Sequence, residues 1–119
     1  MPLLKILTNI ETIPLSEKLQ VHDLGANILS EELGKSLDFV VVILEDGKDL
    51  SFGGDSAQPA SYMEIKNVGS LPGKVTDAIS FRLCSLCFDL LGISMDRCYL
   101  EFQESERHLW GWNGKTFAK

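Results

Sequence analysis

Proline stands at position 2, directly after Met1, and its chemical type at this place points to proton transfer. Aminopeptidases remove an initiator methionine that precedes proline, so we expect the mature chain to begin with the secondary amine of Pro2. An α-amino group titrates at about 7.7–8.0, and partial burial or nearby cations lower that pKa. Such an amine could serve as a general base and move protons on carbon. The alternative is that the proline reflects processing alone.

Lys35 is the candidate residue for binding an anion. It follows the expected C-terminal end of a helix, and the corresponding position 58 residues later holds the apolar Ile93. A lysine where the repeated pattern predicts an apolar residue indicates a role in binding. The alternative is that it complements the dipole of the helix.

Tyr99, Glu101 and Gln103 alternate along an expected strand and therefore share one face. The other face, with Cys98, Leu100 and Phe102, should pack on the helices. Tyr99 and Glu101 would then face a neighbouring subunit and could border a shared pocket. Aromatic walls could come from the tail, although ordinary packing would also explain these residues: Trp110, Trp112 and Phe117.

Metal and thiol chemistry are not expected. Cys84 and Cys87 form a C-x-x-C pair, but they lie in a stretch with helical periodicity and are interpreted as core residues. His22 and His108 have no second ligand at metal-binding spacing. We therefore expect no metal and no cofactor.

Most of the candidate site residues lie in a sequence unit that occurs twice in the chain. Leu33–Asp38 recurs as Leu91–Asp96, at an offset of 58 residues. The expected strands are 3–9, 39–44, 61–68 and 98–103, and the expected helices are 16–33 and 74–91. Ser16 should cap the first helix, and Gly34 and Gly92 should end the two helices. Two β-α-β units predict an α+β, ferredoxin-like fold: a four-stranded mixed sheet with both helices on one face.

The remaining expectations concern domains and partners. We expect a single domain over residues 1–119, with repeats at about 2–58 and 60–103 and a tail at 104–119. The strand at 39–44 is apolar on both sides, so a second copy of the chain should cover the open face of the sheet. The charge run at Glu101, Glu104, Glu106 and Arg107 is interpreted as solvated surface.

The charge balance excludes two classes of partner. With a net charge of −6 and no cluster of Lys or Arg, the chain is expected to bind neither nucleic acid nor membranes. Its longest apolar run, 39–44, is far short of the roughly 20 residues that span a bilayer. The three cysteines and the lack of a signal peptide favour the cytoplasm.

A series of short segments occurs in a specific order along the chain: Met1-Pro2, Thr8-Asn9-Ile10, Leu33-Gly34-Lys35, Phe52-Gly53-Gly54, Pro59 with Gly69, Ile93-Ser94, Asp96-Arg97, Tyr99, Gly111-Trp112-Asn113 and Thr116-Phe117-Ala118. In the order and spacing of these motifs the chain resembles the tautomerase superfamily, in the branch of macrophage migration inhibitory factor and D-dopachrome tautomerase.

The resemblance implies a homotrimer whose sheets form a central barrel, with a site at each subunit boundary. It implies keto–enol tautomerase activity on phenylpyruvate-like acids, and extends to dopachrome. Pro2 would be the base, Lys35 the carboxylate binder, Val68 a pocket wall, and Tyr99 a contribution from the adjacent subunit. Trp110, Trp112 and Phe117 would line the aromatic side.

The chain departs from this pattern at four pocket positions. Glu101 replaces an asparagine, Phe39 replaces a tyrosine at the pocket mouth, Lys66 replaces a histidine and Trp110 replaces a smaller aliphatic residue. These four replacements are expected to change the position in which a substrate binds in the pocket. Two alternatives to an enzyme remain open: a cytokine-like binding protein with a vestigial pocket, and a plain ferredoxin-like assembly module.

Overall fold

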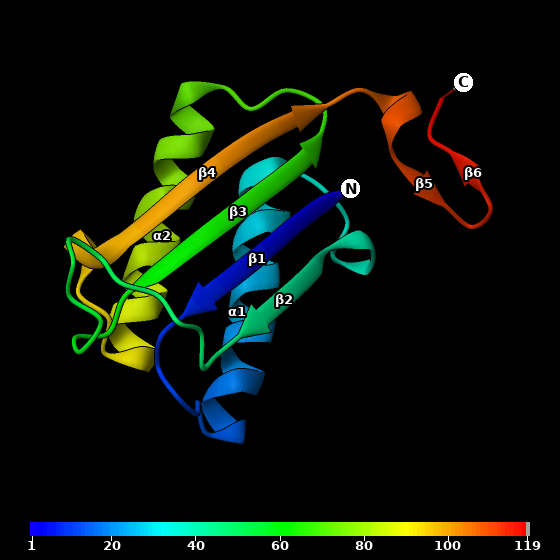
Figure 1. Ribbon diagram of the computed structural model, residues 1–119. Helices are drawn as coiled ribbons and strands as arrows, with labels where there is room; N and C mark the ends of the chain where they lie inside the picture. Colours follow the sequence, from blue (N-terminus) through cyan, green and yellow to red (C-terminus); the bar gives the residue numbers. More distant parts are fainter. Residues whose placement is uncertain (119) are drawn as a thin grey trace.

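Residues 1–118, the part of the chain that the computed structural model describes, fold as two strand–helix–strand units followed by a short hairpin (Figure 1). The first unit contains β1 (Pro2–Thr8), α1 (Leu15–Leu33) and β2 (Val41–Glu45). The second contains β3 (Ser61–Val68), α2 (Gly73–Leu91) and β4 (Cys98–Ser105). Both helices have 19 residues, and α2 begins 58 positions after α1.

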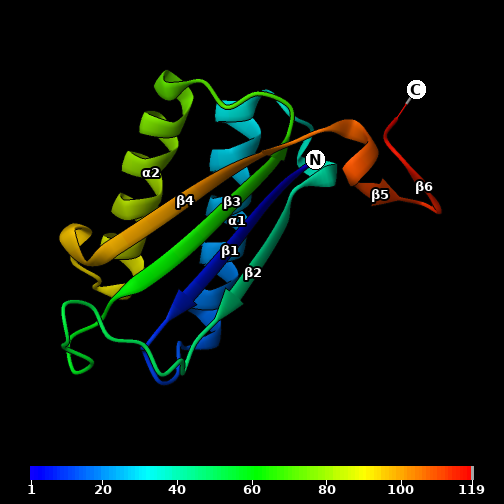
Figure 2. The same cartoon turned by 45° about the horizontal axis from the view of Figure 1, so that its top comes forward.

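The sheet has the strand order β2-β1-β3-β4. β1 is parallel to β2, and β3 is parallel to β4, while the central pair β1 and β3 is antiparallel. The sheet is therefore mixed, and both helices cover the same face (Figure 2). The predicted fold class is confirmed.

Alternation along the strands builds the core. Every second residue of β1 and β3 is buried, because successive side chains point to opposite faces of a strand. The buried set on this face meets the apolar side of the two helices. The fully buried members of this core include Leu4, Ile6, Val21, Leu29, Met63, Ile65, Ile79 and Leu83.

Two local predictions were wrong. The first helix begins at Leu15 after Pro14, so Ser16 lies within the first turn, where its hydroxyl donates to Glu17 instead of capping the helix. Phe39 is not in a strand but ends a single 3-10 turn, η1 (Leu37–Phe39). Ser36 starts that turn by accepting a hydrogen bond from the backbone N–H of Asp38. β2 therefore begins only at Val41.

Two other local predictions are confirmed. Gly34 and Gly92 both end their helices in the left-handed conformation, with φ of 64° and 67°. The Asn113-Gly114 turn has positive φ at both residues and joins β5 (Gly111–Trp112) to β6 (Lys115–Thr116). This tail hairpin lies beyond the end of β4, on the same side of the molecule as the amino terminus (Figures 1 and 2).

The face of the sheet opposite the helices is uncovered in the single chain (Figure 2). Apolar and aromatic side chains are exposed on it, among them Val41, Ile43 and Tyr99, with 53%, 38% and 66% of their surface accessible. A strand edge and face of this kind is a ready surface for another copy of the chain.

A clamp fixes the long connection 46–60 between β2 and β3. The Asn9 amide donates to the carbonyl oxygens of three residues of this segment and accepts from the Ala60 N–H. The guanidinium of Arg97 donates to four more carbonyl oxygens, those of Phe52, Asp55, Gln58 and Pro59. The segment is thereby ordered although it contains no helix and only one isolated β-bridge.

Candidate active site

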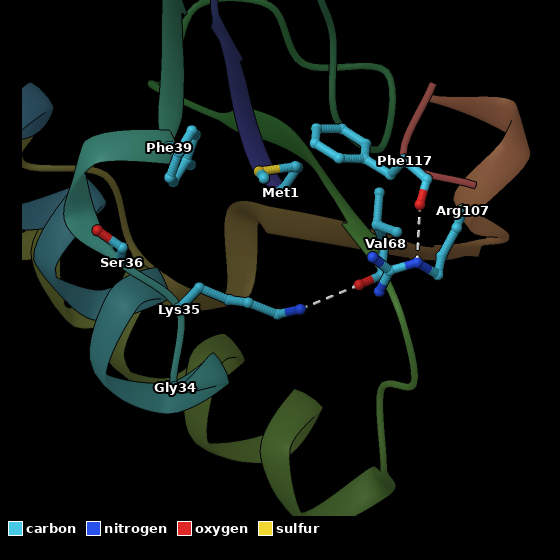
Figure 3. A pocket seen from close by; sticks show the side chains of 8 residues that line it. All are labelled: Met1, Gly34, Lys35, Ser36, Phe39, Val68, Arg107 and Phe117. Atoms are coloured by element: carbon cyan, nitrogen blue, oxygen red, sulfur yellow. Dashed lines mark hydrogen bonds between the residues drawn. The ribbon is translucent and has the colours of Figure 1, made fainter. Parts of the chain in front are cut away.

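The amino terminus lies where three strand ends and the tail come together. Pro2 is buried and pairs with Asn67 near the end of β3, while Leu3 pairs with Val41 at the start of β2. Met1 extends beyond the sheet into a cavity of about 240 Å³. The cavity is lined by Met1, Gly34, Lys35, Ser36, Phe39, Val68, Arg107 and Phe117 (Figure 3).

The end of α1 positions Lys35. Gly34 turns the chain in the left-handed conformation, and the Lys35 N–H donates to the Ser30 carbonyl at 3.1 Å. The Ser30 hydroxyl in turn donates to the Lys35 carbonyl at 2.6 Å, so the backbone is held from both sides. The side chain then crosses the cavity, and its Nζ donates to the Val68 carbonyl at 3.1 Å (Figure 3).

Arg107 supplies a second positive charge to the same cavity. It begins the 3-10 turn η3 (Arg107–Leu109) directly after β4, and its Nε donates to the Phe117 carbonyl at 2.9 Å. Figure 3 shows Lys35 and Arg107 extending toward Val68 from opposite sides. The cavity is therefore cationic at one end.

This environment acts on the amino group of the chain. Burial lowers the pKa of the Met1 amino group below its ordinary value, and the positive charges of Lys35 and Arg107 lower it further. Both effects disfavour the protonated amine. An amine of this kind is a base at lower pH than one on an open surface.

Aromatic side chains form a second cavity, of about 190 Å³, that shares Met1, Phe39 and Phe117 with the first. The rings of Phe39 and Trp112 meet edge to face with centroids 5.2 Å apart. The rings of Trp112 and Phe117 stack with centroids 6.4 Å apart. The other lining residues of this cavity are Pro2, Asp38, Val41, Trp110 and Gly111. The two cavities together join a cationic end, an amine and an aromatic slot.

Seven of the nine predicted site residues line these two cavities within one chain: Pro2, Lys35, Phe39, Val68, Trp110, Trp112 and Phe117. Phe39 reaches the cavity from η1, although it was predicted on a strand. The aromatic tail lies close by because the tail hairpin folds back beside η1.

Tyr99 and Glu101 lie elsewhere in the chain. Tyr99 pairs with Tyr62 near the start of β3, roughly 17 Å along the strand from Asn67 at about 3.3 Å per residue. It packs on Phe52, with ring centroids 4.9 Å apart. Glu101 accepts a hydrogen bond from the Tyr62 hydroxyl at 2.7 Å. Neither residue reaches the cavity of its own chain.

Sequence reasoning missed Arg107, which was interpreted as part of a solvated charge run. The residue is exposed, but it lines the cavity because the chain turns at η3 immediately after β4. The one sequence signal that could have indicated a place in the cavity was the position of Arg107 just before the aromatic residues of the tail. Ser36, another lining residue, was also not anticipated.

The cysteines and histidines take no part in this site. Cys84 and Cys87 lie in the middle of α2 and are buried, which confirms their interpretation as core residues on a helix. Within residues 1–118 no group of three metal-ligating side chains comes together. No helix in that range is long and apolar enough to cross a membrane.

Comparisons with known proteins agree with one another. The family model described as macrophage migration inhibitory factor (MIF) matches residues 1–118. The chain is 32% identical to the macrophage migration inhibitory factor homolog of Brugia malayi over 94 residues, covering 79% of this chain and 81% of the relative. It is 30% identical to the homolog of Trichuris trichiura, covering 98% and 100%. The solved structure of the homologue from Prochlorococcus marinus is 33% identical, with a TM-score of 0.89 and coverage of 98% and 99%.

Proposed function

Because this chain belongs to the macrophage migration inhibitory factor family of the tautomerase superfamily, we propose that it is a keto–enol tautomerase of phenylpyruvate-like 2-keto acids. One observation carries the proposal: Met1 lies in a cavity with two cations, and burial and their charge lower the pKa of its amino group, an environment that the Pro2 amine would share after removal of Met1. A base of lowered pKa beside an anion site suits the abstraction of a proton from carbon next to a carbonyl group.

The base in this proposal is the secondary amine of Pro2 after removal of Met1. In the structure Met1 is present, so the Pro2 nitrogen belongs to a peptide bond and has no basic lone pair. In the processed chain the neutral amine would take a proton from C3 of the keto acid. The electron pair of that C–H bond would form the C2–C3 double bond while the π pair of the carbonyl group moves to its oxygen. The protonated Pro2 amine would then return its proton to that oxygen to give the enol, directly or through water.

The cavities suggest how the substrate is held. Lys35 would bind the carboxylate, since its Nζ points into the cationic end and uses one donor on Val68. The aryl ring would occupy the slot between Phe39, Trp112 and Phe117. This places C3 between the two ends of the substrate, beside the amino terminus. Dopachrome, which also joins a ring to a carboxylate, is a second candidate substrate.

A homotrimer would complete this site. The uncovered face of the sheet, with Val41 and Ile43 exposed at one edge, would be covered by neighbouring copies. Tyr99 is 66% exposed on that same face and could reach the cavity of an adjacent subunit, together with Glu101. Tyr99 would then support the enol oxygen, a role that it cannot take in its own chain.

Turnover of phenylpyruvate by protein of verified N-terminal mass tests the proposal. Processed protein should interconvert the enol and keto forms, and protein that retains Met1 should be inert. Pro2→Ala keeps an amino terminus but loses the ring, so kcat should fall strongly while circular dichroism stays unchanged. Equal rates for Met1-retaining and processed protein would refute the mechanism. Inert processed protein would favour the binding-protein alternative.

A further inference from the structure

We propose that Arg107 is a second carboxylate-binding residue of this cavity, which grips the same substrate carboxylate as Lys35. The inference rests on the proposed function and adds a residue that the motifs did not reveal. It also specifies the substrate: an aryl 2-keto acid with one ionised carboxylate, which both cations would contact.

The wall of the cavity holds Arg107 firmly. Its backbone carbonyl accepts a hydrogen bond from the Phe117 N–H at 3.2 Å, and its Nε donates to the Phe117 carbonyl at 2.9 Å. These two bonds fix the arginine against one of the aromatic residues that both cavities share. Figure 3 shows the guanidinium beside Val68, facing the end of the Lys35 side chain.

The nitrogens that remain on Arg107 are suited to a carboxylate. The bond to Phe117 uses Nε alone, so the two terminal nitrogens, which make no hydrogen bond within residues 1–118, point away from that bond. The end of a guanidinium fork can bind a carboxylate through two parallel hydrogen bonds. Arg97 shows the contrast, since all three of its nitrogens are taken up by backbone carbonyl oxygens.

Charge favours an anion between the two cations. Neither Lys35 nor Arg107 forms an ion pair within residues 1–118, in a chain with 17 acidic and 11 basic residues. The acidic residues close to Arg107 in sequence contact other groups. The Glu104 carboxylate accepts a hydrogen bond from the Leu71 N–H, and a carboxylate oxygen of Glu106 lies 3.3 Å from Nδ1 of His108. A carboxylate would relieve the repulsion between two uncompensated positive charges.

One carboxylate fits the cavity better than two separate acidic groups. Both cations extend toward the same residue, Val68. The second cavity is lined mainly by aromatic rings, and its one charged lining residue, Asp38, is acidic and would repel a second acidic group. An aromatic slot would leave a second acidic group desolvated and unpaired. The arrangement therefore matches a monoacid with an aryl group at its other end.

Arg107→Met removes the charge and keeps most of the stem, and Lys115→Met removes a charge from the same tail as a matched control. Arg107→Met should raise KM for phenylpyruvate on the order of 10–100-fold, the loss expected of a charge-assisted bond. Lys115→Met should leave KM unchanged. For phenylpyruvate methyl ester, which has no carboxylate, Arg107→Met should have no effect on KM. Combined with Lys35→Met, it should raise KM by less than the product of the two single effects.

Two results would overturn the inference. An equal rise of KM for the acid and the ester would show that Arg107 only braces the tail through Phe117. An unchanged KM for both would show that it does not contact the substrate.

A binding experiment separates this inference from the proposed function. Phenylacetate and the neutral phenylacetamide are titrated while the fluorescence of Trp110 and Trp112 is recorded. If Arg107→Met weakens binding of phenylacetate alone, the carboxylate role stands even where the wild-type protein does not turn over phenylpyruvate. If it weakens both ligands equally or neither, the role is refuted whatever the enzymatic activity.

Discussion

Methionine at position 35 would keep most of the lysine stem and remove the ammonium group that lies 3.1 Å from the Val68 carbonyl oxygen. The backbone should stay in place, because the Ser30 hydroxyl and carbonyl bind the main chain of residue 35 and not its side chain. Lys35→Met therefore isolates the effect of one positive charge on the cavity.

Two effects on catalysis are expected. A hydrogen bond to a charged group contributes about 1.5–3 kcal/mol, so KM for phenylpyruvate should rise on the order of 10–100-fold. The second effect concerns the base. The charge of Lys35 lowers the pKa of the Met1 amino group, although burial is the larger cause. We expect the same charge to act on the Pro2 amine of the processed chain, so its removal should raise the pKa of that amine.

The assay is the pH profile of kcat/KM for phenylpyruvate, with processed wild-type protein and the variant compared. The neutral amine is the active form, so kcat/KM rises with pH through the pKa of the amine and then levels off. In Lys35→Met that rise should occur at higher pH. An unchanged KM together with an unchanged profile would refute both the carboxylate role of Lys35 and its electrostatic effect on the base.

Three further predictions concern the fold. Leu83→Ala, at a fully buried position, should lower the free energy of unfolding by about 2–5 kcal/mol in urea titrations at fixed protein concentration, whereas Phe81→Ala, 65% exposed on the same helix, should change it little. Arg97→Met removes four hydrogen bonds to carbonyl oxygens and should expose segment 46–60 to limited proteolysis, with cleavage elsewhere unchanged. Burial raises the pKa of Cys84 to about 11, and Cys87 is fully buried. Both thiols should therefore react with a thiol reagent at neutral pH only after denaturant is added. Fast labelling of either thiol in the native protein would contradict their assignment to the core.

The sequence predicted the main elements because periodicity and helix-ending glycines are local signals. The two helices start within one residue of their expected positions, and β3 has the expected bounds. Phe39 shows the limit of such signals. An apolar residue next to a strand has the composition of the strand, and only the hydrogen bond between the Ser36 side chain and the Asp38 N–H turns the chain there.

The candidate site was less accessible to prediction. Pro2 and Lys35 were identified because their residue types are unusual at their positions. Arg107 was missed because its place in the cavity depends on the path of the chain after β4, and no local pattern encodes that path. Tyr99 illustrates a different gap: its face of the strand was predicted correctly, yet the cavity that it would serve is not in its own chain.

The two strand–helix–strand units carry different kinds of residue at two pairs of equivalent positions. Each helix ends in a left-handed glycine, but Lys35 follows the first and Ile93, fully buried, follows the second. The counterpart of Pro2 is Ala60, which is also fully buried and whose amide nitrogen donates to the Asn9 side chain. A lysine placed at position 93 would carry its charge into the core, where no site for an anion exists at the equivalent place in the described residues. Under the proposed function, the first unit supplies the base and the carboxylate binder, whereas the equivalent positions of the second unit, Ala60 and Ile93, are packed in the interior.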